Sequence, residues 1–594
     1  MTPREQTIVT TEGTDLLSIL VQQEHLTEDQ AEQCRKRVRR AAVPSHQAVL
    51  DLGFTSQQAV FRALSQCNGM PFVILAEQTI PEDVQAHVPA KVALHYRLVP
   101  LSLERGTLTA AFSNPPTIRD RENLRLLLGM RLSPVLATPI EVNSALKKMY
   151  GLGAETVIQL RQGRSFERRS ESVVYGDTDG QDLEAEDAES ASIIQLVNQI
   201  LMEAVELGTT DIHVEPFKDK CRVRYRIDGM LRDIPTPPGM LELHDAIVSR
   251  MKIMASLNIA ERRLPHDGRI RVNIGDDSFD LRVSILPTRF GETLCLRILS
   301  SSSIFLDMAQ LGLGRGHLCI LEQLIRLPHG ILLVTGPTGS GKTTTLYAAL
   351  AQVRNTNPER KIITVEDPVE YELVGTTQIQ IKSDIGLTFA SGLRSILRHD
   401  PDIVLIGEIR DAETAEIAIR AALTGHLVLS TLHTNDSVGA INRLVDMGVE
   451  PYLVASSLSA SMAQRLVRRI CPHCKAEVEH IPHRLRSEIA QCLDIPPEDV
   501  HAWEGKGCME CNQTGYRGRV AIYEFFLLDE EIQDMVSAHL QTSELRKAAI
   551  KRGMHTLRED GWAKVAQGQT TIDEVTRMTS TFKISYELPE EEEQ

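Results

Sequence analysis

The 594-residue sequence lacks a long apolar run. A membrane-spanning helix needs about 20 consecutive apolar residues, whereas runs such as residues 331–334 have the length of a buried strand. The first residues are polar, so the apolar segment of a secretory signal peptide is also missing. We therefore expect a cytoplasmic protein that reaches the inner membrane only through its partners.

An excess of positive charge is missing as well. Lys and Arg together number 64 against 80 Asp and Glu, which gives a formal net charge of −16. The sequence also lacks a basic face interleaved with aromatic side chains, and both absences disfavour binding to nucleic acid. Apolar residues make up 42% of the chain, so most of it can bury ordinary cores.

The pattern along the chain changes several times. Residues 15–80 carry apolar side chains at helical spacing, and residues 87–150 mix short strands with helices. A basic stretch followed by an acidic one predicts a solvated linker over residues 152–190. Alternating strands follow, and from residue 321 onward apolar strands alternate with helices, the pattern of a parallel sheet with crossover helices.

A glycine-rich loop follows one of these apolar strands. Residues 336–343 match G-x-x-x-x-G-K-[ST] between a predicted strand and a predicted helix, which is the context that this phosphate-binding motif requires. Glycines let backbone N–H groups converge on phosphates, and the helix N-terminus adds a favourable dipole. We expect Lys342 to reach the β- and γ-phosphates of ATP and the Thr343 hydroxyl to ligate Mg²⁺. The residues predicted to bind the nucleotide are Gly336, Pro337, Thr338, Gly339, Ser340, Gly341, Lys342, Thr343 and Thr344.

Three polar residues follow further predicted strands of the same sheet. Glu408 comes after the apolar residues 403–406, and Glu366 and His433 occupy similar places. Open α/β sheets bind ligands at the carboxyl ends of their strands. We predict that Glu408 positions or deprotonates the attacking water, that Glu366 holds water or Mg²⁺, and that His433 senses the γ-phosphate. Each also has a purely structural alternative, such as capping a helix.

Four of the ten cysteines form two C-x-x-C pairs, Cys471 with Cys474 and Cys508 with Cys511. Four thiolates suit a tetrahedral Zn²⁺, and a reducing compartment favours a metal over a disulfide. The gap between the pairs is wider than in the usual zinc ribbon. Because four protein thiolates leave no open coordination position, the predicted zinc site is structural; a redox pair is the alternative.

Taken together, these motifs resemble the ATPases of type II secretion and type IV pilus assembly, of the extension type. The resemblance rests on a long stretch at residues 397–411, an acidic box at 363–370, a histidine box at 423–436, and upstream stretches at 211–216 and 222–229. It extends over residues 190–594, with looser similarity over residues 15–150.

The resemblance implies an α/β fold with a RecA-like phosphate-loop ATPase domain. It also implies a preceding α+β (PAS-like) domain, a four-cysteine zinc module and an N-terminal domain that is helical and then α+β. The expected limits are 1–151 for an N-terminal docking domain, 152–190 for the linker, 191–306 for the second N-terminal domain, 307–464 for the ATPase domain, 465–520 for the zinc module and 521–594 for a C-terminal helical region.

The resemblance further implies a ring-shaped homo-hexamer that powers secretion or pilus assembly. Arg282 and Arg297 would complete the ATP site, because charge on the transferring phosphoryl group needs guanidinium neutralisation. The alternative for both is a surface ion pair. The implied partner of the N-terminal domain is an inner-membrane platform protein. Some such domains bind cyclic di-GMP through Arg-Leu-Gly stretches, but residues 14–17 and 45–47 lack that arginine, which removes the obvious contact for this ligand and favours the docking role.

Three other functions compete with this one. A pilus-retraction motor is a close rival, although the N-terminal domain and the four-cysteine module argue against it. A RecA-like nucleic-acid translocase is disfavoured by the charge balance. A nucleotide-bound scaffold without turnover is disfavoured because Lys342 and Glu408 are both present. The sequence does not separate secretion from pilus assembly.

Overall fold

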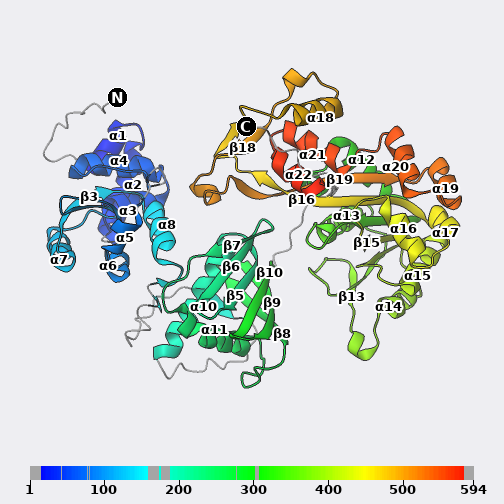
Figure 1. Cartoon of the computed structure of the whole chain (residues 1–594), viewed down its shortest axis with the longest axis horizontal. Helices are drawn as coiled ribbons and strands as arrows, with labels where there is room; N and C mark the ends of the chain where they lie inside the picture. The colour runs from blue at the N-terminus through cyan, green and yellow to red at the C-terminus, as the bar shows by residue number, and fades with distance from the viewer. Residues whose placement is uncertain are drawn as a thin grey trace, which may run out of the picture. The chain divides into compact units, whose positions relative to one another are not determined.

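The computed structural model describes residues 15–41, 43–75, 78, 80–154, 156–157, 173–175, 188–275, 277–300 and 307–580. The chain divides into two compact units, residues 1–298 and residues 299–594 (Figure 1). Each unit has hydrophobic cores of its own. Among the described helices, none combines the length and the apolar character that crossing a bilayer requires.

The first unit begins with four helices around one apolar core. They are α1 (Leu16–Gln22), α2 (Glu28–Ala41), α3 (Ser45–Leu52) and α4 (Gln57–Asn68). The short helices α5 (Glu82–Ala86) and α6 (Ala90–Tyr96) lead to a small sheet of β1 (Leu98–Glu104), β2 (Thr107–Phe112) and β3 (Arg131–Leu136). Two helices, α7 (Ile118–Leu128) and α8 (Pro139–Tyr150), pack against this sheet through buried Leu124, Val142 and Leu146.

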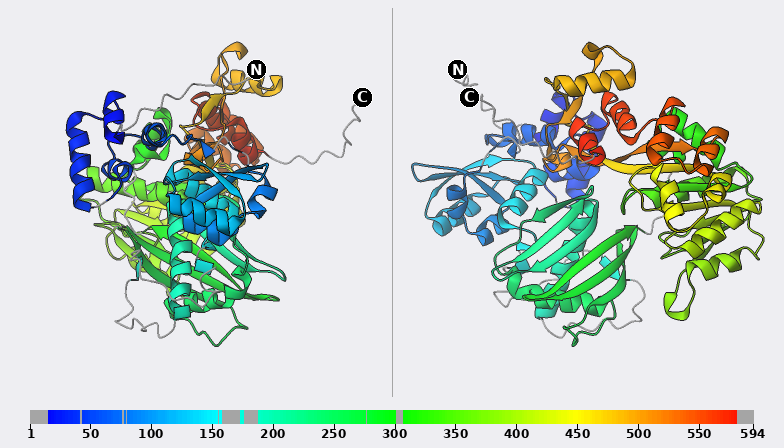
Figure 2. Two further views of the ribbon diagram at one scale, coloured as in Figure 1. Left: turned by 90° about the vertical axis from the view of Figure 1, so that its left-hand side faces the viewer. Right: turned by 45° about the vertical axis from the view of Figure 1, so that its right-hand side comes forward.

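A second domain of the first unit is built on a seven-stranded sheet in the order β4-β8-β9-β10-β5-β6-β7, which faces the viewer in the right-hand view of Figure 2. Its strands are β4 (Val173–Tyr175), β5 (Thr209–Pro216), β6 (Cys221–Ile227), β7 (Met230–Ile234), β8 (His266–Ile274), β9 (Asp277–Thr288) and β10 (Gly291–Ser300). One face packs against α10 (Ala188–Glu206) and α11 (Met240–Met254). Alternation along β6 buries Val223 and Tyr225 on that face and places Arg222, Arg224 and Arg226 on the other.

The described parts of residues 152–190 differ from the solvated linker that we expect there. Leu152 and Val157 are buried in the core of the second domain, and the Leu152 N–H donates to the Pro235 carbonyl at 2.8 Å. Strand β4 pairs antiparallel with β8. Apolar side chains at the start of this segment join the domain core because they are not part of the charged stretches. Residues 158–172 and 176–187 lie outside the described residues.

The second unit contains a seven-stranded sheet in the order β13-β12-β14-β15-β11-β16-β19. The strands are β11 (Gly330–Thr335), β12 (Ile362–Glu366), β13 (Thr377–Gln380), β14 (Ile403–Ile406), β15 (Leu427–Leu432), β16 (Leu458–Ile470) and β19 (Tyr516–Leu527). From β13 to β16 all neighbours are parallel. The central strands β11, β12, β14 and β15 are fully buried, as their continuous apolar runs predict.

Helices cover both faces of this sheet. Leu332 and Val334 of β11 join a core with α12 (Arg315–Leu324) and α13 (Lys342–Thr356). Ile331 and Leu333, which alternate with them, join a core with α14 (Phe389–Ile396), α15 (Ala412–Leu423), α16 (Gly439–Asp446) and α17 (Pro451–Ser457). The last helices of the described residues are α19 (Glu530–Ser537), α20 (Thr542–Lys551), α21 (Leu557–Ala566) and α22 (Ile572–Thr579). This is the RecA-like α/β arrangement that the sequence predicts.

The long antiparallel pair of β16 and β19 is not anticipated from the sequence. These two strands extend across residues 464 and 520, where the sequence places the limits of the zinc module. Between them lie all four paired cysteines, the small strands β17 (Lys475–Glu477) and β18 (Trp503–Gly505), and helix α18 (His483–Leu493). The cysteine segment therefore emerges from two strands of the ATPase sheet.

Candidate active site

The loop between β11 and α13 has the close packing that its glycines allow. Gly336 has φ +147° and Gly341 has φ +87°. A Cβ on Gly336 would lie 2.6 Å from the backbone oxygen of Gln464, and one on Gly341 would lie 2.8 Å from Gln464 Nε2. Strand β16 thus presses against the loop from the side, so at these two positions only glycine fits both the backbone angle and the space.

Lys342 lies inside this loop with 8% of its surface exposed. Its Nζ donates to the Gly336 carbonyl at 2.8 Å and to the Pro337 carbonyl at 3.1 Å. Burial lowers the pKa of Lys342 from 10.5 to about 8; nearby Glu408 opposes this shift, and Arg465 adds to it. A phosphate oxygen would supply the negative charge that the two carbonyl groups lack, so this ammonium group is suited to bind an anion.

Glu408 follows β14, as predicted, and its carboxylate contacts both Arg410 and His433. Arg410 forms an ion pair with Oε1, and His433 Nε2 lies 3.2 Å from Oε2. Burial would raise the pKa of Glu408, but the hydrogen bonds and charges of Arg410 and His433 outweigh it, so the pKa lies below its usual value. The backbone is fixed as well, since the Thr431 hydroxyl donates to the Gly407 carbonyl at 2.7 Å. The structure thus brings Glu408 and His433 together.

Glu366 ends β12 and is only 3% exposed. Its carboxylate accepts hydrogen bonds from the Tyr347 hydroxyl at 2.5 Å, from Thr364 Oγ1 at 2.6 Å and from Gln378 Nε2 at 3.3 Å. Burial raises its pKa, against the effect of these donors. Tyr347 belongs to α13, so Glu366 ties its strand to the helix that begins at the phosphate loop. Direct contact with Mg²⁺ would compete with these three hydrogen bonds.

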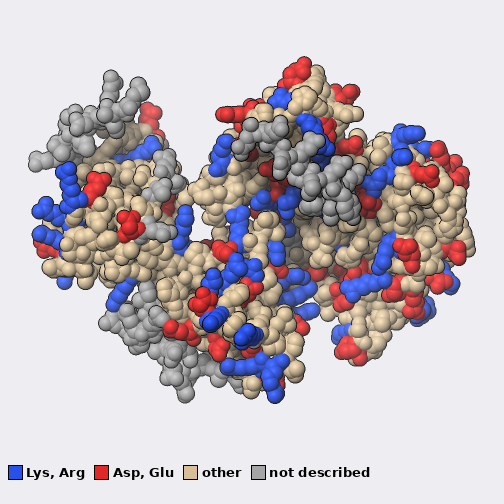
Figure 3. Space-filling model, in the orientation of Figure 1, with Lys and Arg blue, Asp and Glu red and all other residues tan. Residues whose placement is uncertain are grey.

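Arg282 and Arg297 lie side by side in the first unit, on the sheet face opposite to α10 and α11. They line a cavity of about 510 Å³ together with Asp267, Gly268, Arg269, Val283, Ser284 and Cys295. Arg269 of β8 is the cross-strand partner of Arg282, and Arg297 Nε lies 3.1 Å from Asp211 Oδ1. Lys and Arg side chains gather over this domain in Figure 3. The cavity therefore holds several guanidinium groups beside the carboxylate of Asp267.

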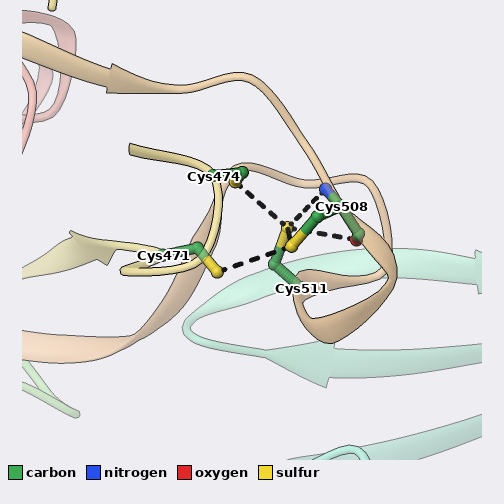
Figure 4. A group of neighbouring side chains, drawn as sticks. All are labelled: Cys471, Cys474, Cys508 and Cys511. Atoms are coloured by element: carbon green, nitrogen blue, oxygen red, sulfur yellow. Dashed lines mark hydrogen bonds between the residues drawn. The ribbon is translucent and has the colours of Figure 1, made fainter. Parts of the chain in front are cut away.

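The four paired cysteines converge at one point (Figure 4). Their sulfur atoms all lie within 4.8 Å of one another, and the Sγ atoms of Cys471 and Cys508 and those of Cys474 and Cys511 are 3.8 Å apart. A disulfide requires about 2.05 Å, so these are free thiols. Backbone N–H groups of Gly507 and Gly515 donate to the sulfurs of the cluster at 3.3 and 3.2 Å. The arrangement is compatible with binding a metal ion.

The family described as Type II/IV secretion system protein matches residues 186–577, which is more than half of the chain. The chain belongs to this family. An MshEN domain matches residues 68–156. The predicted family and fold class are therefore confirmed.

Three relatives illustrate the similarity. The type IV pilus assembly ATPase PilB of Myxococcus xanthus (strain DK1622) is 42% identical over 540 residues, which cover 90% of this chain and 93% of that protein. The type II secretion system protein E of Xanthomonas campestris pv. campestris is 41% identical over 536 residues, covering 89% and 92%. The type II secretion system protein HxcR of Pseudomonas aeruginosa is 51% identical over 391 residues, covering 66% and 78%. The predicted ATPase activity is confirmed by this family membership.

Sequence reasoning missed several partners of the site residues. Arg410 lies in the stretch that carries Glu408, but nothing in the sequence indicates that their side chains pair. Tyr347 and Gln378 are far from Glu366 along the chain. Arg465 lies on β16, a strand that the sequence did not predict. Only contacts between separate elements reveal these roles.

Proposed function

We propose that this chain is the ATPase of a type II secretion or type IV pilus assembly machine, that it works as a homo-hexamer, and that it hydrolyses ATP at the loop of Lys342. The observation that carries the proposal is the buried ammonium group of Lys342 in the glycine-rich loop, with the negative charge of Glu408, which follows β14 of the same sheet, near enough to raise its pKa. The relative from Myxococcus xanthus is named as a type IV pilus assembly ATPase and the other two as type II secretion system proteins, which supports this proposal; pilus retraction is the less favoured alternative.

The residues divide the work in the following way. Backbone N–H groups of the loop and Lys342 hold the phosphates. Thr343 lies in the first turn of α13, where its hydroxyl would bind Mg²⁺. Mg²⁺ neutralises charge that develops on the phosphate oxygens. Glu408 stays ionised at neutral pH because its pKa is low, so it can orient the attacking water and accept its proton. His433 holds that carboxylate in place from the next strand along the sheet.

We assign Arg282 and Arg297 to the ATP site of a neighbouring subunit in the ring. Guanidinium groups neutralise the charge on the transferring phosphoryl group. The cavity that both arginines line in the first unit supports this assignment, because it offers several guanidinium groups to one anion. Placing these groups on another domain would couple hydrolysis to domain movement.

We infer that the cysteine cluster holds Zn²⁺ as a structural ion. Four sulfurs at Zn–S distances of about 2.3 Å form a tetrahedron with edges of about 3.8 Å. The separations of 3.7 to 3.8 Å between paired sulfurs support this choice. We further propose that the N-terminal domain docks on an inner-membrane protein of the machine, so that the chain acts at the cytoplasmic face of that membrane without entering it.

The test is the rate of ATP hydrolysis by the assembled protein with Glu408→Gln. The amide keeps the shape of the side chain but cannot accept the proton, so turnover should fall by about 10²- to 10⁴-fold, while ATP binding is retained. The matched control is Glu416→Gln on α15, a surface residue that pairs only with Arg420. Equal rates for wild type and Glu408→Gln would remove Glu408 from its role, and an absence of ATP binding by wild type would overturn the proposed function itself.

A further inference from the structure

Arg465 lies between the phosphate loop and the segment that follows β15. On β16 it comes two residues after Ala463, which pairs with Thr335 at the end of β11. Its side chain is 8% exposed. Nη2 donates to the backbone oxygen of Asn435 at 3.0 Å and to Asn435 Oδ1 at 3.2 Å. One half of the guanidinium group therefore holds the segment that begins at His433.

The other half of the guanidinium group faces the phosphate loop. Nη1 lies 3.2 Å from the point that a Cβ on Gly336 would occupy, and it has no hydrogen-bond partner among the described residues. Ser340 Oγ lies 2.7 Å from the same point, is part of a side chain with 3% exposure, and likewise has no partner within the described ranges. Two buried polar atoms thus converge beside Gly336 with hydrogen-bonding capacity unused, which is costly unless a ligand supplies the partner.

The charges at this point favour an anion. Lys342 and Arg465 are each 8% exposed, and the positive charge of Arg465 contributes to the low pKa of Lys342. Burial also lowers the pKa of Arg465, and the negative charges of Asp436 and Glu524 partly offset this shift. Two buried cations at one loop repel each other unless a negative group lies between them. The phosphate groups of a bound nucleotide are the anions that this loop holds.

We propose that Arg465 is a phosphate-binding residue supplied by the same subunit: Nη1 binds the γ-phosphate of ATP while Nη2 retains Asn435. This inference rests on the proposed function, since it deepens the description of the same site. The γ-phosphate is favoured over the β-phosphate because the segment held by Nη2 begins at His433, which contacts Glu408 where the attacking water would be held.

The contact between Arg465 and the γ-phosphate would also couple the bound nucleotide to helix α20. Asp436, next to Asn435, forms an ion pair with Arg546 of α20, with 2.6 Å between Oδ2 and Nη2. The Ser437 hydroxyl donates to Glu524 Oε1 at 2.5 Å, and Glu524 of β19 is 2% exposed. A movement of Asn435 that follows the γ-phosphate would therefore reach α20 through charged groups that are already in contact. The position of α20 would therefore depend, through Arg465, on whether ATP or ADP is bound.

The experiment measures the dissociation constants of ADP and of a non-hydrolysable ATP analogue for the full-length chain. For Arg465→Gln, loss of a hydrogen bond to a charged group should weaken the ATP analogue by about tenfold to hundredfold, while ADP affinity changes little. Arg468→Gln on the same strand is the matched control, because its guanidinium pairs with Glu574, away from the loop. Hydrogen exchange in α20 should differ between the ATP-analogue and ADP states in wild type and lose that difference in Arg465→Gln.

A purely structural role predicts another result. If Arg465→Gln weakened ADP and the ATP analogue equally, or neither, the γ-phosphate contact would be refuted, while normal ATP hydrolysis by wild type would leave the proposed function intact. If the glutamine variant did not fold, Arg465→Lys would decide. Its single ammonium group cannot reach both Asn435 and the phosphate, so the preference for ATP over ADP should still fall; an unchanged preference would overturn the proposal.

Discussion

Raising the pH should weaken ATP binding through Lys342. In the protein without nucleotide, burial holds the pKa of this ammonium group at about 8 instead of 10.5. Each pKa unit corresponds to about 1.4 kcal/mol, so the charged form is disfavoured by about 3 kcal/mol at this site. Phosphate binding requires the charged form and should raise the pKa again. Lys342 therefore takes up a proton when ATP binds at a pH above about 8.

The magnitude follows from linkage. Near pH 7 the group is already charged and about 0.1 proton should be taken up, whereas near pH 9 about 0.9 proton should be taken up and affinity should fall by roughly tenfold for each further pH unit. Calorimetry with a non-hydrolysable ATP analogue, in two buffers that differ in ionisation enthalpy, measures this uptake directly. Lys342→Arg is the comparison, because a guanidinium group stays protonated throughout this range.

One experimental result would refute the low pKa of Lys342 in the protein without nucleotide. If wild type took up no proton near pH 9 and its affinity were the same as near pH 7, the ammonium group would not be held in a low-pKa state by burial. The terminal phosphate of the ATP analogue also titrates near neutral pH, so the proton uptake measured with Lys342→Arg is subtracted as the baseline.

Two further outcomes are expected. Arg282→Ala should leave nucleotide binding nearly intact but lower turnover of the assembled protein by about a thousandfold or more, because its contact forms mainly in the transition state; an equal loss in the dissociation constant would contradict this. Removal of metal by a chelator should increase hydrogen exchange in residues 465–520 while leaving α13 and β11 protected, because the ion crosslinks only the cysteine segment. An unchanged exchange pattern after verified metal loss would show that the cluster is held without an ion.

Local features of the fold were predictable from the sequence. Strands β1, β2 and β3 lie within residues 87–150, where short strands are expected, and β11 extends the predicted 331–334 by one residue at each end. These segments have a clear period or a continuous apolar run, so the signal lies within the segment itself. The phosphate loop was predictable for the same reason, because strand, loop and helix are consecutive.

Strand β16 shows why the rest was not predictable. It buries Ser461, Gln464 and Arg465 beside apolar residues, so it has neither a continuous apolar run nor a clean alternation. Its polar side chains form hydrogen bonds with groups that are distant along the sequence. Gln464 accepts from Thr345 of α13 at 2.9 Å, and Arg465 donates to Asn435. The environment of Glu366 depends in the same way on Tyr347. Such contacts follow from the order of strands in the sheet, which the sequence does not state.

The same strand has a mechanical consequence. Arg465, beside the phosphate loop, is six residues from Cys471 of the cysteine cluster, or about 20 Å along an extended chain. Hydrogen bonds to β19 hold this span on one side, with Gln464 opposite Tyr523 and Val467 opposite Val520. The register of this pairing shifts between Arg468 and Ile470, so a displacement beside the nucleotide would reach the cysteines through an irregular step in the strand. A metal ion bound by the four cysteines would fix the chain just beyond the end of β16, on the far side of this step.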